Sequence, residues 1–151
     1  MISLCNMAYK IITKIISNRL KHGLSRWIAR EHFGFLENRQ IIDVIGIAHE
    51  VLHTFKIKHL EALDFKMDLV KAFDKVDWVY LKLILIQMGL PLLVTKWIMV
   101  CISSACFVVL VIETPTSFFK GSRGLRQGCP LLPVLFLLVV EGLSRLINKA
   151  I

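Results

Sequence analysis

Apolar residues near the start of the chain recur with a helical period. Lysine, serine and asparagine fall between these apolar residues, which are Ala8, Ile11, Ile12, Ile15, Ile16 and Leu20. The spacing predicts an amphipathic helix with a basic outer face, which Gly23 can end. A second helical pattern runs through Val44, Ile45, Ile47, Ala48, Val51, Leu52 and Phe55. The polar stretch 32–40 between the two patterns is expected to be irregular.

The apolar pattern changes to a period of two between Leu60 and Leu69. Leu63, Phe65, Met67 and Leu69 alternate there with Asp64, Lys66 and Asp68. This alternation predicts a strand that ends at Asp68, with the carboxylate on the face opposite the apolar set. After a short turn, Asp77 is a good N-cap for a helix from Trp78 to about Met88. Gly89 with Pro91 is a strong signal for the end of that helix.

The last third of the chain predicts further short elements and one long helix. A short helix is expected over 94–102, and the continuous apolar run 107–112 predicts a buried strand. A turn over 113–117 and a return strand at 118–119 follow. Residues 120–130 form a loop rich in glycine and cations, and 131–149 predicts a long helix. The mixture indicates an α+β fold in which helices dominate.

Composition and charge narrow the class of protein. The apolar fraction of 56% exceeds the usual range of about 45–50%, so the chain is either a membrane protein or a piece of a larger protein whose buried surfaces lack their covering. The longest apolar run, 131–140, is interrupted by Pro133 and reaches half of the roughly 20 residues of a membrane span, which favours a buried helix. The net charge of +8 makes nucleic acid the first candidate partner, and a merely basic soluble protein is the alternative.

The cysteines and the N-terminal segment indicate where the protein resides. Four cysteines stand at positions 5, 101, 106 and 129, and no pair has the spacing of a zinc site. The start of the chain has no basic segment followed by an apolar stretch, as a signal peptide would. We therefore expect free thiols in an intracellular protein, nuclear or cytoplasmic, that is not secreted.

Two segments could carry chemistry. The first, 65–74, places Asp68 at a strand end before a tight turn, where carboxylate oxygens suit a magnesium ion. Asp74 and Asp77 crowd the same region, and a solvated turn neutralised by its lysines is the alternative. The second, 122–130, combines glycines that let the backbone approach a ligand with Arg123 and Arg126, which suit phosphate. An ordinary connecting loop is the alternative there.

Taken together and in this order, the two segments resemble the motifs of reverse transcriptases from plant LINE-type (non-LTR) retrotransposons. DLVKAFD is similar to the family motif D-x-x-x-A-[FY]-D, and RQGCPLLP is similar to R-Q-G-D-P-L-S-P. ISLCNMAYKIITKIISNRLK resembles a helix of the fingers, GFLENRQIID the F-x-x-G-R block, and FLLVVEGLSRLI the helix after the second motif. The resemblance covers nearly the whole chain.

The resemblance implies roles for individual residues. Asp68 would bind the two magnesium ions of nucleotidyl transfer, with the backbone carbonyl of Leu69 as a possible second ligand. Phe73 stands at the aromatic steric gate beneath the sugar, although it could instead be a core phenylalanine. Gln127 and Gly128 would line the nucleotide and template pocket, and the residues implied to touch nucleic acid are Arg39, Arg123 and Arg126. The implied partners are an RNA template, a DNA primer and a deoxynucleoside triphosphate, with no membrane.

The implied fold is the fingers and partial palm of a right-hand polymerase. Residues 1–59 would be fingers-like, 60–77 the palm strand and turn, 78–128 the return through the fingers, and 129–151 the palm helix. Several positions depart from the family pattern. Cys129 replaces the acidic residue and Leu132 the serine of the second motif, so we expect weaker capping of the long helix. Asn38 replaces a glycine, and Ile112-Glu113 replaces Asn-Gly in a hairpin, which loses a strong turn signal.

The Tyr-Ala-Asp-Asp motif, which supplies the other metal-binding aspartates in the family, is absent from these 151 residues, as are the thumb and the rest of the palm. A site with one of its three carboxylates should bind magnesium poorly, so we expect no polymerase activity from this chain alone. Two alternatives stay open. One is a non-catalytic, basic nucleic-acid-binding remnant. The other is a non-functional relic that folds poorly because apolar surface is bare.

Overall fold

The computed structural model describes residues 6–24, 26–29, 32, 34, 40–59, 61 and 68–150. Its helices are α1 (Met7–Leu24), α2 (Ile41–Ile57), a 3-10 helix η1 (Ala72–Lys75), α3 (Trp78–Gln87), α4 (Leu92–Ser103) and α5 (Leu132–Ala150). Its strands are β1 (Cys106–Phe107), β2 (Leu110–Val111), β3 (Thr114–Pro115) and β4 (Phe119–Lys120). The described part of the chain is therefore α+β and helix-rich, as predicted.

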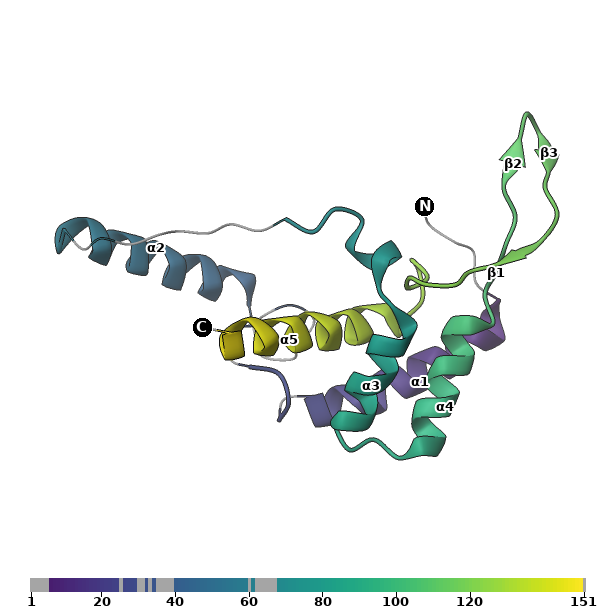
Figure 1. The fold of residues 1–151 in the computed structure, drawn as a ribbon, viewed down its shortest axis with the longest axis horizontal. Helices are drawn as coiled ribbons and strands as arrows, with labels where there is room; N and C mark the ends of the chain where they lie inside the picture. The colour runs from purple at the N-terminus through teal and green to yellow at the C-terminus, as the bar shows by residue number, and fades with distance from the viewer. Residues whose placement is uncertain are drawn as a thin grey trace.

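Four helices, α1, α3, α4 and α5, pack around one apolar core (Figure 1). The core takes Leu81 and Leu85 from α3, Ile98 from α4, and Leu135 and Leu138 from α5, each 1% exposed or less. A buried leucine or isoleucine contributes roughly 1.5–3 kcal/mol, so this cluster is the main source of stability in the described region. It fixes α5 against α3, on which the candidate site depends.

Local sequence signals set the bounds of α3 as predicted. The side chain of Asp77 accepts a hydrogen bond from the backbone N–H of Tyr80 at 2.8 Å, which is the capping interaction expected of an N-cap aspartate. The helix ends at Gln87, and Gly89 follows with a φ of +76°. A left-handed residue just beyond a helix favours glycine, because glycine has no Cβ to clash.

Helix α1 forms where predicted, but the predicted buried face is wrong in part. Ile11, Ile12 and Ile15 are 50–53% exposed, whereas Thr13 and Ser17 are buried. The Thr13 hydroxyl donates to the carbonyl oxygen of Tyr9 at 2.8 Å, which removes most of the cost of burying it. The helix also runs through Gly23 to Leu24, one residue beyond the predicted end.

The buried strand predicted over 107–112 is wrong. Two short antiparallel pairs, β1 with β4 and β2 with β3, form a hairpin that projects from the helices (Figure 1). Leu110 and Ile112 are 71% and 93% exposed. Ile112 and Glu113 take φ values of +47° and +63° at the tip. The turn thus forms at the position where the family pattern has Asn-Gly, but with residues that disfavour a left-handed backbone.

Helix α2 covers the predicted segment and lies apart from the other helices in Figure 1. Its apolar side chains Ile42, Ile45, Val51 and Leu52 are all exposed. Most of the strand predicted over 60–69 falls outside the described residues, and its last two residues, 68 and 69, are irregular. In the regions that are described, no helix is both long enough and apolar enough to cross a membrane.

Candidate active site

The segment with Asp68 enters the four-helix group through a tight turn. Asp68 and Leu69 are exposed, and Lys71 takes a left-handed backbone with a φ of +52° before η1. Val76 is 5% exposed and Asp77 then begins α3. The carboxylate of Asp68 is thus on the surface, and it is close in the sequence to the buried Val76.

The loop with the second motif docks directly on this turn. The backbone N–H of Gly124 donates to the carbonyl oxygen of Val76 at 2.7 Å. The backbone N–H of Leu125 donates to the carbonyl oxygen of Phe73 at 2.8 Å. The indole N–H of Trp78 donates to the carbonyl oxygen of Gly124 at 2.8 Å. Three hydrogen bonds therefore join segments that are about fifty residues apart in the sequence.

Gly124 is required at this contact. Its φ is +88°, and a Cβ there would lie 2.8 Å from the carbonyl oxygen of Asp74 and 3.1 Å from its Cα. Both obstacles are backbone atoms, which cannot move aside as a flexible side chain can. The sequence predicted that glycines in this loop approach a ligand closely, whereas Gly124 approaches the other motif of the same chain.

Phe73 packs against the long helix. Its ring centroid lies 4.4 Å from that of Phe136 on α5, with the planes tilted by 53°. Aromatic pairs in such a geometry contribute about 0.5–1.5 kcal/mol beyond the area they bury. Phe73 thus links η1 to α5. The sequence did not single out Phe136, because its partner is distant in the chain.

A cavity of about 520 Å³ lies between this turn and α5. Asp68, Lys75, Asp77 and Tyr80 line it, together with apolar side chains of α5 that include Phe136 and Val140. The cavity therefore combines two carboxylates with an apolar wall.

The described residues do not make a complete metal site. They contain no group of three or more histidine, cysteine or acidic side chains that could hold a metal ion. Asp77 already accepts a hydrogen bond as the N-cap of α3. Asp68, even with a backbone carbonyl, offers fewer ligands than magnesium needs in a dedicated site.

The other predicted binding residues lie in or beside the docked loop. Gln127 and Gly128 form a turn before α5, with Gly128 at a φ of +89°. Arg123 is exposed, whereas the Arg126 guanidinium lies 5.7 Å from the ring centroid of Tyr9 on α1. A cation over an aromatic face is stabilising, so Arg126 has a structural contact in addition to the phosphate-binding role predicted for it. Arg39 lies outside the described residues.

Cys129, at the position of the family's acidic residue, faces the protein interior. It is 8% exposed, and its thiol donates to the hydroxyl of Tyr9 at 3.4 Å. That hydroxyl in turn donates to the carbonyl oxygen of Cys101 at 3.0 Å. Burial, and then the nearby Cys129, raises the pKa of Cys101. A thiol suits this buried position because it needs less solvation than a carboxylate.

Glu141 on α5 forms a buried cluster that the sequence did not reveal. Its carboxylate accepts hydrogen bonds from the backbone N–H of Ala29 at 3.0 Å and from Arg145 at 2.7 Å, and it lies 2.8 Å from His32 Nδ1. Burial alone would raise the pKa of Glu141, but the hydrogen bonds from Arg145, Ala29 and His32 outweigh it and lower this pKa. Arg145 also donates to the carbonyl oxygen of Trp27. In the sequence, the available signal for this cluster is that Glu141 is a single acidic residue directly after the long apolar run 131–140.

The sequence of the chain is similar to known proteins along nearly its whole length. The sequence profile of the family described as "Reverse transcriptase (RNA-dependent DNA polymerase)" matches residues 1–151. The chain is 31% identical over 148 residues to the "Transposon TX1 uncharacterized 149 kDa protein" of Xenopus laevis, with 98% of this chain and 11% of that protein covered. It is 28% identical over 148 residues to the "Retrovirus-related Pol polyprotein from type-1 retrotransposable element R2" of Nasonia vitripennis, covering 95% of this chain and 14% of that protein. The chain thus spans a small part of the curated relatives it matches.

Proposed function

The chain belongs to the reverse transcriptase (RNA-dependent DNA polymerase) family, and on this premise we propose that it is part of the RNA-directed DNA polymerase domain of a LINE-type non-LTR retrotransposon. Its similarity to the R2 retrotransposable element protein supports the element class. The plant origin expected from the motifs stays a prediction. The proposed segments are those expected from the sequence, with 60–77 and 129–151 in the palm and the others in the fingers.

The observation that carries this proposal is the docking of the second motif on the first. A polymerase must hold its metal-binding carboxylate and its nucleotide-binding loop at one site. The contacts of Gly124 and Leu125 hold the loop of the second motif against 73–78, the segment that follows Asp68 in the chain. In the proposal Asp68 contributes a carboxylate to the metal site and the carbonyl of Leu69 a further oxygen. Phe73 contacts the sugar, and Gln127 and Gly128 line the nucleotide pocket.

We also propose that residues 1–151 alone do not polymerise. The basis is that the Tyr-Ala-Asp-Asp motif, which supplies the other metal-binding carboxylates in the family, is absent from these residues, and that the described residues include no cluster able to hold a metal. In the intact family, bound magnesium activates the primer hydroxyl and stabilises the leaving pyrophosphate. Primer extension on an RNA template with the purified chain tests this proposal. We expect only background incorporation, at the same level in the chain and in its Asp68→Ala variant. Template-dependent incorporation that is abolished by Asp68→Ala would overturn the proposal.

Basic charge favours a second candidate function, which is nucleic-acid binding without catalysis. The net charge is +8, and the exposed Arg123 lies in the docked loop. Binding to an RNA–DNA hybrid should weaken as salt rises, because each phosphate contact releases counterions. Arg123→Ala should reduce the salt slope by about one unit if this residue contacts a phosphate. The matched control is Lys82→Ala. Lys82 is exposed on α3 and lines neither the cavity near Asp68 nor the cavity between α3 and α5. Absence of binding at low salt would exclude this function.

A further inference from the structure

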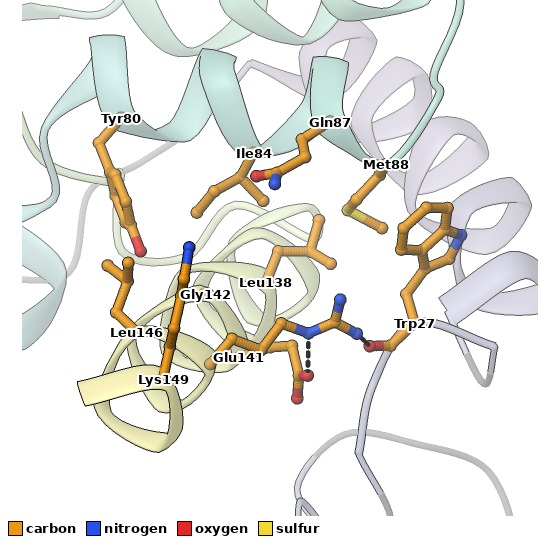
Figure 2. Close-up of a pocket in the computed structure, with 11 residues that line it drawn as sticks. Trp27, Tyr80, Ile84, Gln87, Met88, Leu138, Glu141, Gly142, Leu146 and Lys149 are labelled. Carbon is orange, nitrogen blue, oxygen red and sulfur yellow. Dashed lines mark hydrogen bonds and ion pairs between the residues drawn. The ribbon is translucent and has the colours of Figure 1, made fainter. Parts of the chain in front are cut away.

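A second cavity lies between α3 and α5 and is closed on one side by Trp27. Its volume is about 260 Å³. Figure 2 shows Tyr80 and Trp27 on opposite sides of it, with Ile84 of α3, Met88 just after the end of α3, and Leu138 of α5 between them. Its walls are therefore aromatic and aliphatic, as in sites for small organic ligands.

The cavity is preformed by two features of α5. Gly142 has no side chain where a Cβ would lie 2.7 Å from the Tyr80 hydroxyl and 2.8 Å from Ile84 Cδ1, so α3 and α5 approach closely at this end. Arg145 donates hydrogen bonds to both the Glu141 carboxylate and the carbonyl oxygen of Trp27, which ties the Trp27 segment to α5 beside the cavity. A cavity with fixed walls loses little entropy when a ligand binds.

The charges around the cavity are unbalanced. The charged residues that line it, in the described part of the chain, are Glu141, Arg145 and Lys149. Glu141 and Arg145 form an ion pair at 2.7 Å and compensate each other. Lys149 has no carboxylate partner within the described ranges, and it leaves one positive charge beside an apolar cavity. Such a combination is complementary to an anion with an apolar body.

From the cavity and its charge we infer that it binds a small aromatic carboxylate, with the rings between Trp27 and Ile84 and the carboxylate near Lys149. A volume of about 260 Å³ is just below the range of about 300–1,000 Å³ of drug-sized sites, so a compound of two fused rings is the size that fits. Among the residues that the structure describes, Tyr80 alone is shared by the linings of this cavity and of the one that contains Asp68. The inferred site is therefore separate from the candidate active site and does not depend on the proposed function.

Titration calorimetry of the full 151-residue chain with naphthoate tests the inference, with the uncharged naphthamide as the matched ligand. One naphthoate should bind per chain, about three- to fivefold more tightly than naphthamide, because an exposed ion pair contributes up to about 1 kcal/mol. Lys149→Glu should weaken naphthoate by a similar factor and leave naphthamide unchanged. Lys82→Glu is the control for charge, and Gln87→Trp, which fills the cavity from its rim, should abolish binding of both ligands.

Several results would overturn the inference. One is binding of several naphthoate molecules per chain with unchanged affinity in Gln87→Trp, because the ligand would then coat exposed apolar surface elsewhere. Another is equal affinity for naphthoate and naphthamide. A third is an equal loss in Lys82→Glu and Lys149→Glu, which would show an effect of net charge alone. The inference would also be overturned if neither ligand showed saturable binding. This result would include the case in which another segment of a longer protein fills the cavity.

Discussion

The backbone N–H of Gly124 donates to the carbonyl oxygen of Val76 across 2.7 Å and joins the two segments that carry the family motifs. Val76 lies between Asp74 and the N-cap of α3, and Gly124 lies between Arg123 and Arg126. The contact is made by backbone atoms, so it depends on the absence of a side chain at position 124 more than on the identity of its neighbours.

Replacing Gly124 should therefore separate the motifs. Gly124→Ala forces a Cβ against the Asp74 backbone at a φ of +88°, and strain of this kind costs about 1–3 kcal/mol. Chemical denaturation should show this loss of unfolding free energy. Gly23→Ala is the control, because a Cβ there meets nothing within 4 Å and alanine favours a helix. Equal stability of Gly124→Ala and the wild type would contradict the contact.

The ring pair of Phe73 and Phe136 should couple energetically. A double-mutant cycle with Phe73→Leu and Phe136→Leu should give a coupling free energy of about 0.5–1.5 kcal/mol, because the ring centroids are 4.4 Å apart. Unfolding free energies of the four proteins provide the measurement. Additive single effects would show that Phe73 does not pack on α5.

Glu141 should make stability fall in acid. A carboxyl whose pKa is lowered in the folded state stabilises the protein above its unfolded pKa, and this contribution is lost as pH falls through the folded pKa. The unfolding free energy should therefore decrease as the pH falls below the ordinary glutamate pKa of 4.5, and it should decrease by less in Glu141→Gln. Glu50→Gln, on the exposed helix α2, should keep the wild-type pH dependence. Identical pH profiles for Glu141→Gln and the wild type would contradict a charged, hydrogen-bonded Glu141.

The hairpin tip should become more rigid with the residues typical of its turn. Ile112 and Glu113 both have positive φ, so Ile112→Asn with Glu113→Gly relieves strain of about 1 kcal/mol or more. Amide hydrogen exchange at Val111 and Thr114 should slow. Leu110→Asn, which changes an exposed strand residue of the same hairpin, should not slow it. Faster exchange in the double variant would show that the turn has another geometry.

The elements that were predicted correctly depend on local signals. Asp77 caps α3 and Gly89 follows its end because a cap and a left-handed residue act on their immediate neighbours. Burial is not set by local signals, because it depends on which other parts of the chain cover a side chain. The run 107–112 looked like a buried strand because of its composition, and Ile11, Ile12 and Ile15 looked like the inner face of α1 because of their spacing, yet most of these side chains are exposed.

The sequence motifs name candidate site residues, whose roles stay predictions, but they do not indicate the contacts that the structure shows. The motifs identify Asp68, Phe73, Gln127 and Gly128 by local patterns. The Gly124 contact, the Phe136 ring and the Glu141 cluster join positions that are far apart in the chain, so one sequence gives no signal of their pairing. Arg39 and most of the strand before Asp68 lie outside the described residues, and the predictions made for them stay predictions.

The most direct test of the proposed role in reverse transcription supplies this chain with a complete domain. Residues 1–151 replace the matching 148-residue segment in the R2 retrotransposable element protein of Nasonia vitripennis, and RNA-templated primer extension by the chimera is measured with magnesium. Template-dependent incorporation is expected, with a loss of at least about 100-fold in the Asp68→Ala chimera, because catalysis by two metal ions needs each carboxylate in place. Incorporation by the Asp68→Ala chimera at the rate of its parent would contradict the assignment of Asp68 and, with it, the proposed active site.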